Sequence, residues 1–248
     1  MDNSIDDAIR SGFPIRLEGM VVIVGSYGSG KTEVAVNLAV NRKKAGMDVA
    51  IADLDLVNPY FRAREARRAL SELGIRVVIP PEQYLQADLP ILTPAVAGLI
   101  RNPTQISILD AGGDPAGATA LAALSDAFRA LSATAKPLHI LQVINPFRPF
   151  TETIEGCLKI RAGIENASRL SITGVIGNAN LIEETRIEDI ERGYEFVAML
   201  SEKTNLPVEF ITISRELAGH SDLHRFSCPV LMIERQMAPP WDRAAKLQ

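Results

Sequence analysis

Residues 19–62 read GMVVIVGSYGSGKTEVAVNLAVNRKKAGMDVAIADLDLVNPYFR, and this stretch decides the fold. It opens with an unbroken apolar run, turns through a glycine-rich segment at residues 25–30, and continues with apolar residues at helical spacing. A second apolar run at residues 48–53 then ends in acidic residues. The pattern predicts a strand, a tight glycine loop, a helix and a second strand, which is how many α/β folds begin.

The rest of the chain repeats this alternation. Apolar, strand-like runs occur at residues 20–25, 48–53, 75–80, 105–113, 138–145, 170–178 and 208–214. Helical patterns occupy residues 31–46, 58–74, 117–133, 151–163 and 183–204, and Gly46 and Gly74 are expected to end the first two. Continuous apolar strands suit a sheet covered on both faces, and alternation with helices favours parallel pairing. We predict one α/β domain over residues 1–248, with a mostly parallel sheet of about seven strands and a tail at 236–248.

Composition excludes several classes of protein. The chain has 248 residues, 47% of them hydrophobic, and a formal net charge of −4, so no overall basic field would attract nucleic acid. The two cysteines, Cys157 and Cys228, lie far apart and outside any zinc or disulfide spacing, and we expect buried reduced thiols. Neither a targeting segment nor a membrane-spanning apolar run is visible. We therefore expect a cytoplasmic protein without stable membrane association.

The segment GSYGSGKT matches the phosphate-binding pattern G-x-x-x-x-G-K-[ST]. Glycines let the backbone turn its N–H groups toward phosphate oxygens, and the following helix adds its positive N-terminal end. In this arrangement Lys31 would reach the β- and γ-phosphates, and the Thr32 hydroxyl would bind Mg²⁺. The residues expected to hold the nucleotide here are Gly25, Ser26, Tyr27, Gly28, Ser29, Gly30, Lys31, Thr32 and Glu33.

Acidic residues follow two of the predicted strands. Asp53 and Asp55 come at the end of the second, and Asp110, Gly113 and Asp114 come at the end of the fourth, in LDAGGD. Because parallel strands end at one edge of the sheet, these side chains should face the phosphate loop. Carboxylates there can bind Mg²⁺ or orient an attacking water, and a glycine lets the backbone approach a γ-phosphate. The predicted magnesium ligands are Thr32, Asp53, Asp55 and Asp110.

These motifs together resemble those of a known group of P-loop ATPases. The group contains the nitrogenase iron protein, the septum-site and plasmid-partition ATPases, the ATPases that mature metalloenzymes, and the cobyrinic acid a,c-diamide and dethiobiotin synthetases. DLDLVNPYF is similar to its first switch, DAGGD to its second, and TGVIGNAN to the strand whose Asn178 would lie beside the base. The resemblance implies Mg²⁺ and ATP as cofactors, with Lys31 and Asp55 in catalysis, and Asp114 transmitting loss of the γ-phosphate.

The sequence departs from this group at three points. The partition and septum-site ATPases have a signature lysine where this chain has Ser26, and Arg62 or Arg148 could supply the missing charge. No cysteine matches those that hold the iron protein's cluster, which excludes electron transfer of that type. Leu181 stands where guanine-binding members have an aspartate, and a leucine accepts no hydrogen bond, so adenine is favoured.

The leading interpretation is an ATPase that switches state with its nucleotide. By resemblance, such a protein forms a homodimer and acts on a protein partner, in metallocofactor maturation or in positioning a cargo. The first alternative is an ATP-dependent ligase or kinase of the synthetase type, with NPYFR and NPFRPFT lining a substrate pocket. The second is a nucleotide-sensing module with little turnover.

Overall fold

The computed structural model describes residues 14–54, 67–78, 94–112, 115–219 and 222–235. Its strands are β1 (Gly19–Gly25), β2 (Val49–Leu54), β3 (Arg76–Val78), β4 (Ile106–Ala111), β5 (Leu138–Ile144), β6 (Gly174–Gly177), β7 (Val208–Ser214) and β8 (Val230–Ile233). The α-helices are α2 (Lys31–Lys44), α3 (Arg67–Glu72), α4 (Pro94–Arg101), α5 (Pro115–Ala123), α6 (Ser125–Ser132), α7 (Ile154–Ser168), α8 (Ile187–Thr204) and α9 (Arg215–Ala218). Two short 3₁₀ helices cover Ile182–Glu184 and Leu223–Arg225.

The strands form one parallel sheet in the order β3-β2-β4-β1-β5-β6-β7-β8. This confirms the predicted α/β fold with a parallel sheet. The structure describes eight strands rather than about seven, and the strand that was not predicted is β8, which pairs with β7. The helix predictions also need correction. The pattern over 117–133 is two helices, α5 and α6, and the helix predicted over 151–163 runs to Ser168 as α7. Neither α4 nor the four-residue α9 was predicted.

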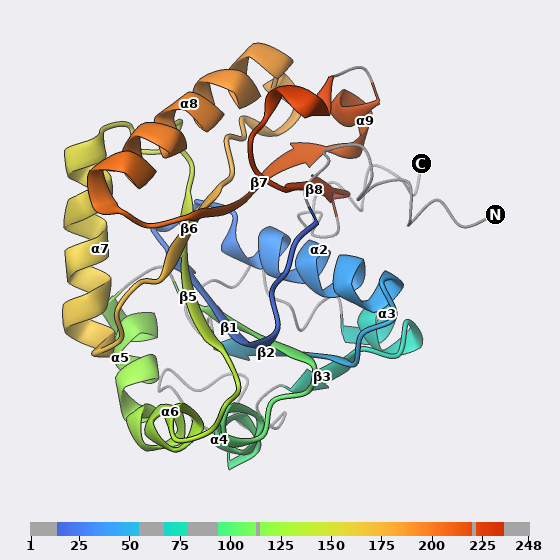
Figure 1. Cartoon of the computed structure of the whole chain (residues 1–248), viewed down its shortest axis with the longest axis vertical. Coiled ribbons are helices and arrows are strands. Elements are labelled where there is room, and N and C mark those ends of the chain that lie inside the picture. Colours follow the sequence, from blue (N-terminus) through green and yellow to red (C-terminus); the bar gives the residue numbers. More distant parts are fainter. Residues whose placement is uncertain (1–13, 55–66, 79–93, 113–114, 220–221, 236–248) are drawn as a thin grey trace, which may run out of the picture.

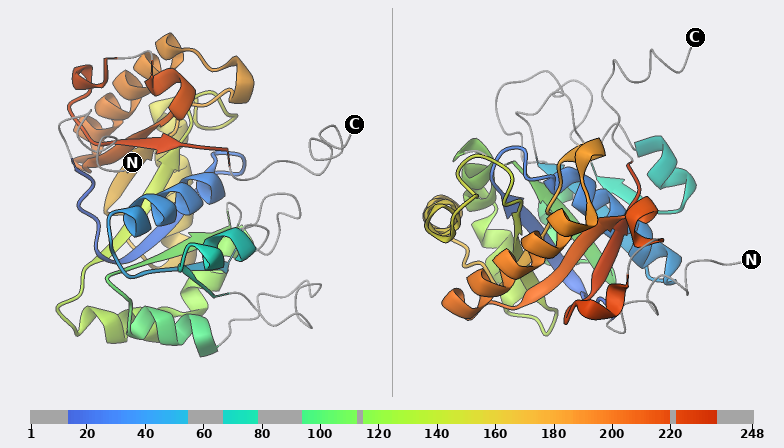
Figure 2. Two further views of the ribbon diagram at one scale, coloured as in Figure 1. Left: turned by 90° about the vertical axis from the view of Figure 1, so that its right-hand side faces the viewer. Right: turned by 90° about the horizontal axis from the view of Figure 1, so that it is seen from above.

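Helices cover both faces of the sheet. The sheet curves around α2, with α3 beside it, while α4 to α8 lie on the outer side of the curve (Figure 1). Figure 2 shows the same layers from two further directions. Alternate residues of each strand separate into two buried apolar layers: Val21 and Ile23 of β1 pack with α2, whereas Met20 and Val22 face α4 and α6. This alternation also determines on which face of the sheet a polar side chain at the end of a strand lies.

The ends of two helices follow from local sequence as predicted. Gly46 has φ 84° and Gly74 has φ 75°, left-handed values that suit glycine. After α2, Met47 N donates to Arg42 O and Gly46 N donates to Lys43 O, a Schellman arrangement that satisfies the last carbonyls. Both predicted helix ends are therefore confirmed.

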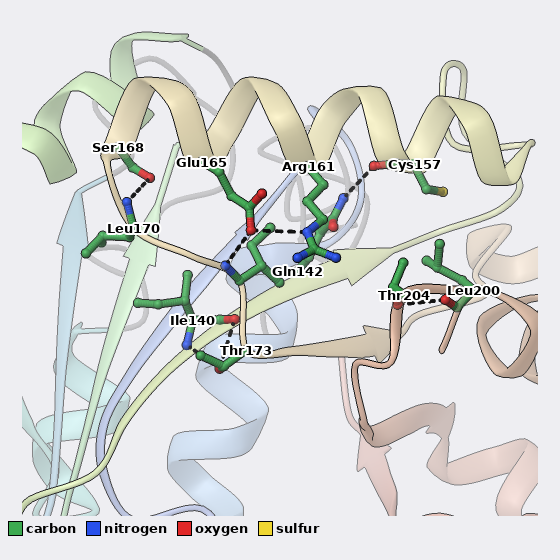
Figure 3. Close-up of polar contacts among 11 residues, drawn as sticks. Ile140, Gln142, Cys157, Arg161, Glu165, Ser168, Leu170, Thr173, Leu200 and Thr204 are labelled. Carbon is green, nitrogen blue, oxygen red and sulfur yellow. Dashed lines mark hydrogen bonds and ion pairs between the residues drawn. The ribbon is translucent and has the colours of Figure 1, made fainter. Parts of the chain in front are cut away.

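Polar contacts fix α7 against β5 and the start of β6 (Figure 3). Gln142, a buried polar residue within β5, donates from Nε2 to the carbonyl of Cys157 on α7 at 3.3 Å. At the other end of α7, Glu165 Oε1 accepts hydrogen bonds from Arg161 Nε at 3.1 Å and from Ile172 N at 2.9 Å. The first contact joins the two elements that flank the β5–α7 loop, and the last joins the end of α7 to the segment just before β6. Within the described part of the chain, no helix has the length and apolar character needed to span a membrane.

Candidate nucleotide site

The glycine-rich loop lies between the end of β1 at Gly25 and the start of α2 at Lys31. Gly28 has φ 72° and Gly30 has φ 89°, both in the left-handed region that an L side chain rarely adopts. Gly30 is the N-cap of α2 and has no side chain to cap it. The first N–H groups of α2 therefore have no side-chain cap, which is the arrangement that binds phosphate at a helix N-terminus.

Lys31 is held under the loop. Its side chain is only 5% exposed, and Nζ donates to the carbonyl of Ser26 at 3.0 Å. The hydroxyl oxygens of Ser26 and Ser29 are buried and have no hydrogen-bond partner among the described residues. Buried hydroxyls normally have a partner, so a phosphate group bound by the loop would satisfy them. Thr32 is also buried, at the first turn of α2.

A pair of polar side chains supports the loop from beneath. Asn178, just after β6, donates from Nδ2 to the carbonyl of Ser29 at 2.7 Å, and Thr212 of β7 donates to Asn178 Oδ1 at 2.5 Å. The two neighbours fix the orientation of the amide, because a carbonyl only accepts and must face the NH₂ group. Asn178 therefore links β7 to the phosphate loop in this structure. Its predicted contact with the nucleotide base stays a prediction.

Two aspartates lie side by side on the face of the sheet that α2 covers. Asp53 of β2 and Asp110 of β4 are partners in the parallel ladder, and both are fully buried. Asp110 is also level with Ile23, whose side chain packs in the layer beneath α2, so all three share that face. α2 begins at Lys31, directly after the phosphate loop. The two carboxylates therefore lie on the same face of the sheet as this helix.

Some of the remaining predicted residues lie in the described part of the chain and others do not. Asp55, Arg62, Gly113 and Asp114 lie outside the described residues. Tyr27 is 73% exposed.

Glu33 accepts a hydrogen bond from Asn37 Nδ2 at 3.0 Å. Asn37 also forms two hydrogen bonds with the backbone of Glu234, at 2.9 and 3.1 Å, and so joins α2 to the end of β8.

Sequence reasoning missed Thr212 and Asn37. Both are polar residues in apolar patterns, at an inward position of β7 and on the buried side of α2. A polar residue at a buried position of an apolar pattern predicts a hydrogen bond to another element, and this signal could have identified both residues. Among the described residues, no group of three His, Cys, Asp or Glu side chains could hold a metal ion.

The cysteines take no part in this site. Both are buried and free, and burial raises the pKa of each thiol to about 12. Because the thiolate is the reactive form, we expect the folded protein to resist labelling by a thiol-specific disulfide reagent at pH 8. The urea-unfolded protein should react rapidly and release two equivalents of the reagent's leaving thiolate per chain. Rapid labelling of the native protein would show that one of these thiols is accessible.

Comparisons with known proteins find likeness in structure alone. No protein-family model matches the chain, and no curated protein is significantly similar in sequence. The cell division protein FtsY of Thermotoga maritima is similar, with a TM-score of 0.55 and 20% identity over 85% of this chain and 68% of that one. The signal recognition particle receptor FtsY of Elizabethkingia anophelis, solved with GDP, gives 0.54 and 18% over 80% of this chain and 57% of that one.

A third neighbour is the signal recognition particle 54 kDa protein of Aeropyrum pernix K1, also solved with GDP. It gives a TM-score of 0.51 and 20% identity over 88% of this chain and 47% of that one. The chain therefore shares its α/β fold, with a parallel sheet, with these three proteins. It spans between about half and two thirds of the length of these three proteins. The narrower resemblance to the iron-protein and septum-site group stays a prediction.

Proposed function

We propose that this protein binds and hydrolyses a nucleoside triphosphate with Mg²⁺, and that ATP is its nucleotide. The observation that carries this proposal is the phosphate loop itself. The buried Lys31, bonded to the Ser26 carbonyl, and two buried serine hydroxyls with no partner among the described residues lie next to a helix N-terminus without a side-chain cap. Lys31 would exchange its contact with the Ser26 carbonyl for the β- and γ-phosphates, which costs no new burial of charge because Nζ is already desolvated.

The donor set suits magnesium. Thr32 offers a hydroxyl beside the loop, and the Asp53–Asp110 pair offers carboxylate oxygens on the same face. Two neighbouring carboxylates repel each other when both are ionised, and a hard divalent cation offsets that repulsion. When bound, Mg²⁺ would neutralise charge on the β- and γ-phosphates as the terminal phosphate leaves. Asp55 is our proposal for the residue that orients the attacking water, and Asp114 for the residue that relays phosphate loss.

The choice of ATP rests on the loop after β6. Leu181 lies there with its N–H bonded to Thr185 Oγ1 at 2.8 Å, and its side chain has no acceptor for the two N–H groups of guanine. Two structural neighbours were solved with GDP, so GTP is the competing nucleotide. A site built to bond guanine loses much of its affinity when the acceptor is missing.

A competition experiment tests the base. We expect ATP to displace a fluorescent triphosphate from the purified protein at least about 10-fold more effectively than GTP, since adenine leaves no donor pair facing Leu181. The Leu181→Asp variant is the matched control, because it restores the guanine acceptor and should raise the affinity for GTP. Stronger displacement by GTP from the wild type would overturn the assignment of ATP.

We further propose that the nucleotide controls contact with a protein partner, and that the chain works as a homodimer. The biological role would be metallocofactor maturation or the positioning of a cargo. Support comes from the motif resemblance and from the position of the first and second switch motifs directly after β2 and β4, the strands that carry Asp53 and Asp110. Conformational change at such switch segments is how loss of a γ-phosphate is transmitted.

A further inference from the structure

The loop between β5 and α7, residues 145–153, leaves the sheet beside the phosphate loop. β5 is the neighbour of β1 (Figure 1). Val143 of β5 is level with Gly25 of β1 in the parallel ladder. Since both strands run in the same direction, the loop that starts at Asn145 and the loop that starts at Gly25 emerge from the same edge. The β5–α7 loop carries one cationic side chain, Arg148.

Hydrogen bonds on both sides fix the backbone at Arg148. Its N–H donates to the carbonyl of Asn145 at 3.2 Å, and its carbonyl accepts from Thr151 N and Thr151 Oγ1, each at 3.1 Å. The same buried hydroxyl of Thr151 also donates to the Asn145 carbonyl at 2.6 Å. The loop is therefore ordered before any ligand arrives, so binding through Arg148 would cost little backbone entropy.

The guanidinium of Arg148 differs from those of Arg42 and Arg161, two other half-buried arginines. Its Nε atom is buried and has no hydrogen-bond partner among the residues that the structure describes. By contrast, Arg42 donates to the carbonyl of Ile15 at 2.7 Å, and Arg161 pairs with Glu165 at 3.1 Å. A buried cationic N–H without an acceptor is costly, and such a group commonly belongs to a ligand site.

We propose that Arg148 binds the terminal phosphate of the nucleoside triphosphate. The planar guanidinium offers two parallel N–H groups to phosphate oxygens, a geometry that a single ammonium lacks. The phosphate loop supplies only one cation, Lys31, because Ser26 stands where related ATPases have a second lysine. Arg148 supplies the second positive charge from the adjacent loop. The inference rests on the proposed function, because it needs a nucleotide in the phosphate loop.

Another source of the same oxyanion chemistry is the carboxylate or phosphate of a second small substrate, as in a ligase. The two possibilities differ in how loss of Arg148 would change nucleotide binding. A contact with the terminal phosphate separates a triphosphate from a diphosphate, whereas a contact with a second substrate leaves the binding of both nucleotides unchanged.

The experiment measures dissociation constants by calorimetry for ADP and for a non-hydrolysable triphosphate analogue, both with Mg²⁺. In Arg148→Met, which keeps the aliphatic stem, we expect affinity for the triphosphate to fall about 10- to 100-fold, the worth of one charge-assisted hydrogen bond, and affinity for ADP to change less than about 2-fold. Arg148→Lys should give an intermediate loss. Arg129→Ala is the matched control, because that side chain is 79% exposed on α6 and pairs with Asp126 on the same helix.

Unchanged affinity for the triphosphate, or an equal loss for both nucleotides, would overturn the proposal. The first result would leave the second-substrate site as the role of Arg148, and the second would mean general support of the nucleotide site. A wild type that binds neither nucleotide would reject the proposed function and this inference together. Thermal melting of each variant separates loss of binding from loss of folding.

Discussion

Replacing Lys31 by alanine is expected to weaken triphosphate binding about 100-fold or more, because a charge-assisted contact to two phosphates is lost from a buried site. The structure places Nζ 3.0 Å from the Ser26 carbonyl at the start of α2, so the ammonium is fixed within the loop that would receive the phosphates. Removal of the amine also leaves that carbonyl without this donor, which should lower the free energy of unfolding by about 1 kcal/mol. Calorimetric titration with a triphosphate analogue gives the affinity, and urea unfolding gives the stability.

The matched control for this variant is Lys44→Ala. Lys44 is exposed in the last turn of the same helix, so its loss changes net charge equally without touching the loop. We expect the control to bind nucleotide like the wild type. If Lys31→Ala keeps the wild-type affinity while the protein remains folded, the phosphates do not bind where we place them.

The second large effect is expected from Gly30→Ala. A methyl group at residue 30 would lie 2.3 Å from Asn178 Nδ2, and φ is +89°, where an alanine is strained. Asn178 cannot simply rotate away, because Ser29 O and Thr212 Oγ1 hold its two ends. Strain together with loss of that buried hydrogen bond should lower the free energy of unfolding by about 2–4 kcal/mol. The same change should disrupt triphosphate binding, since the loop must shift.

Gly28→Ala separates the two causes. Gly28 also has a left-handed φ, +72°, but nothing lies within 4 Å of a methyl group there. Strain alone should then cost about 1–2 kcal/mol. Urea unfolding of both variants measures the difference. Equal costs at the two positions would mean that the Asn178 contact does not support the loop.

Much of the site was readable from sequence because its parts are local. The apolar run before Gly25, the glycine loop and Lys31 lie within a few residues of one another, and their order alone predicts strand, loop and helix. Asp53 and Asp110 were predicted to face the phosphate loop because parallel strands end at one edge, and in the structure they are neighbours in the ladder. These predictions needed only the general rules of α/β sheets.

The rest depends on contacts between distant parts of the chain. Asn178 and Ser29 are 149 residues apart, and no local pattern reveals that an asparagine after β6 holds the phosphate loop. The same holds for Thr212, whose hydroxyl has meaning only once β6 and β7 are neighbours. β8 was also missed, and in the structure its place depends on distant contacts: it pairs with β7, and Asn37 of α2 bonds the backbone of Glu234 directly after it.

The central claim is that this chain hydrolyses a nucleoside triphosphate at the loop before α2. Its most direct test is phosphate release by the purified protein with Mg²⁺ and either ATP or GTP, with Lys31→Ala in parallel. We predict release from ATP that requires Mg²⁺ and is lost in the variant. Absence of release with both nucleotides, or release that survives in Lys31→Ala, would contradict the account.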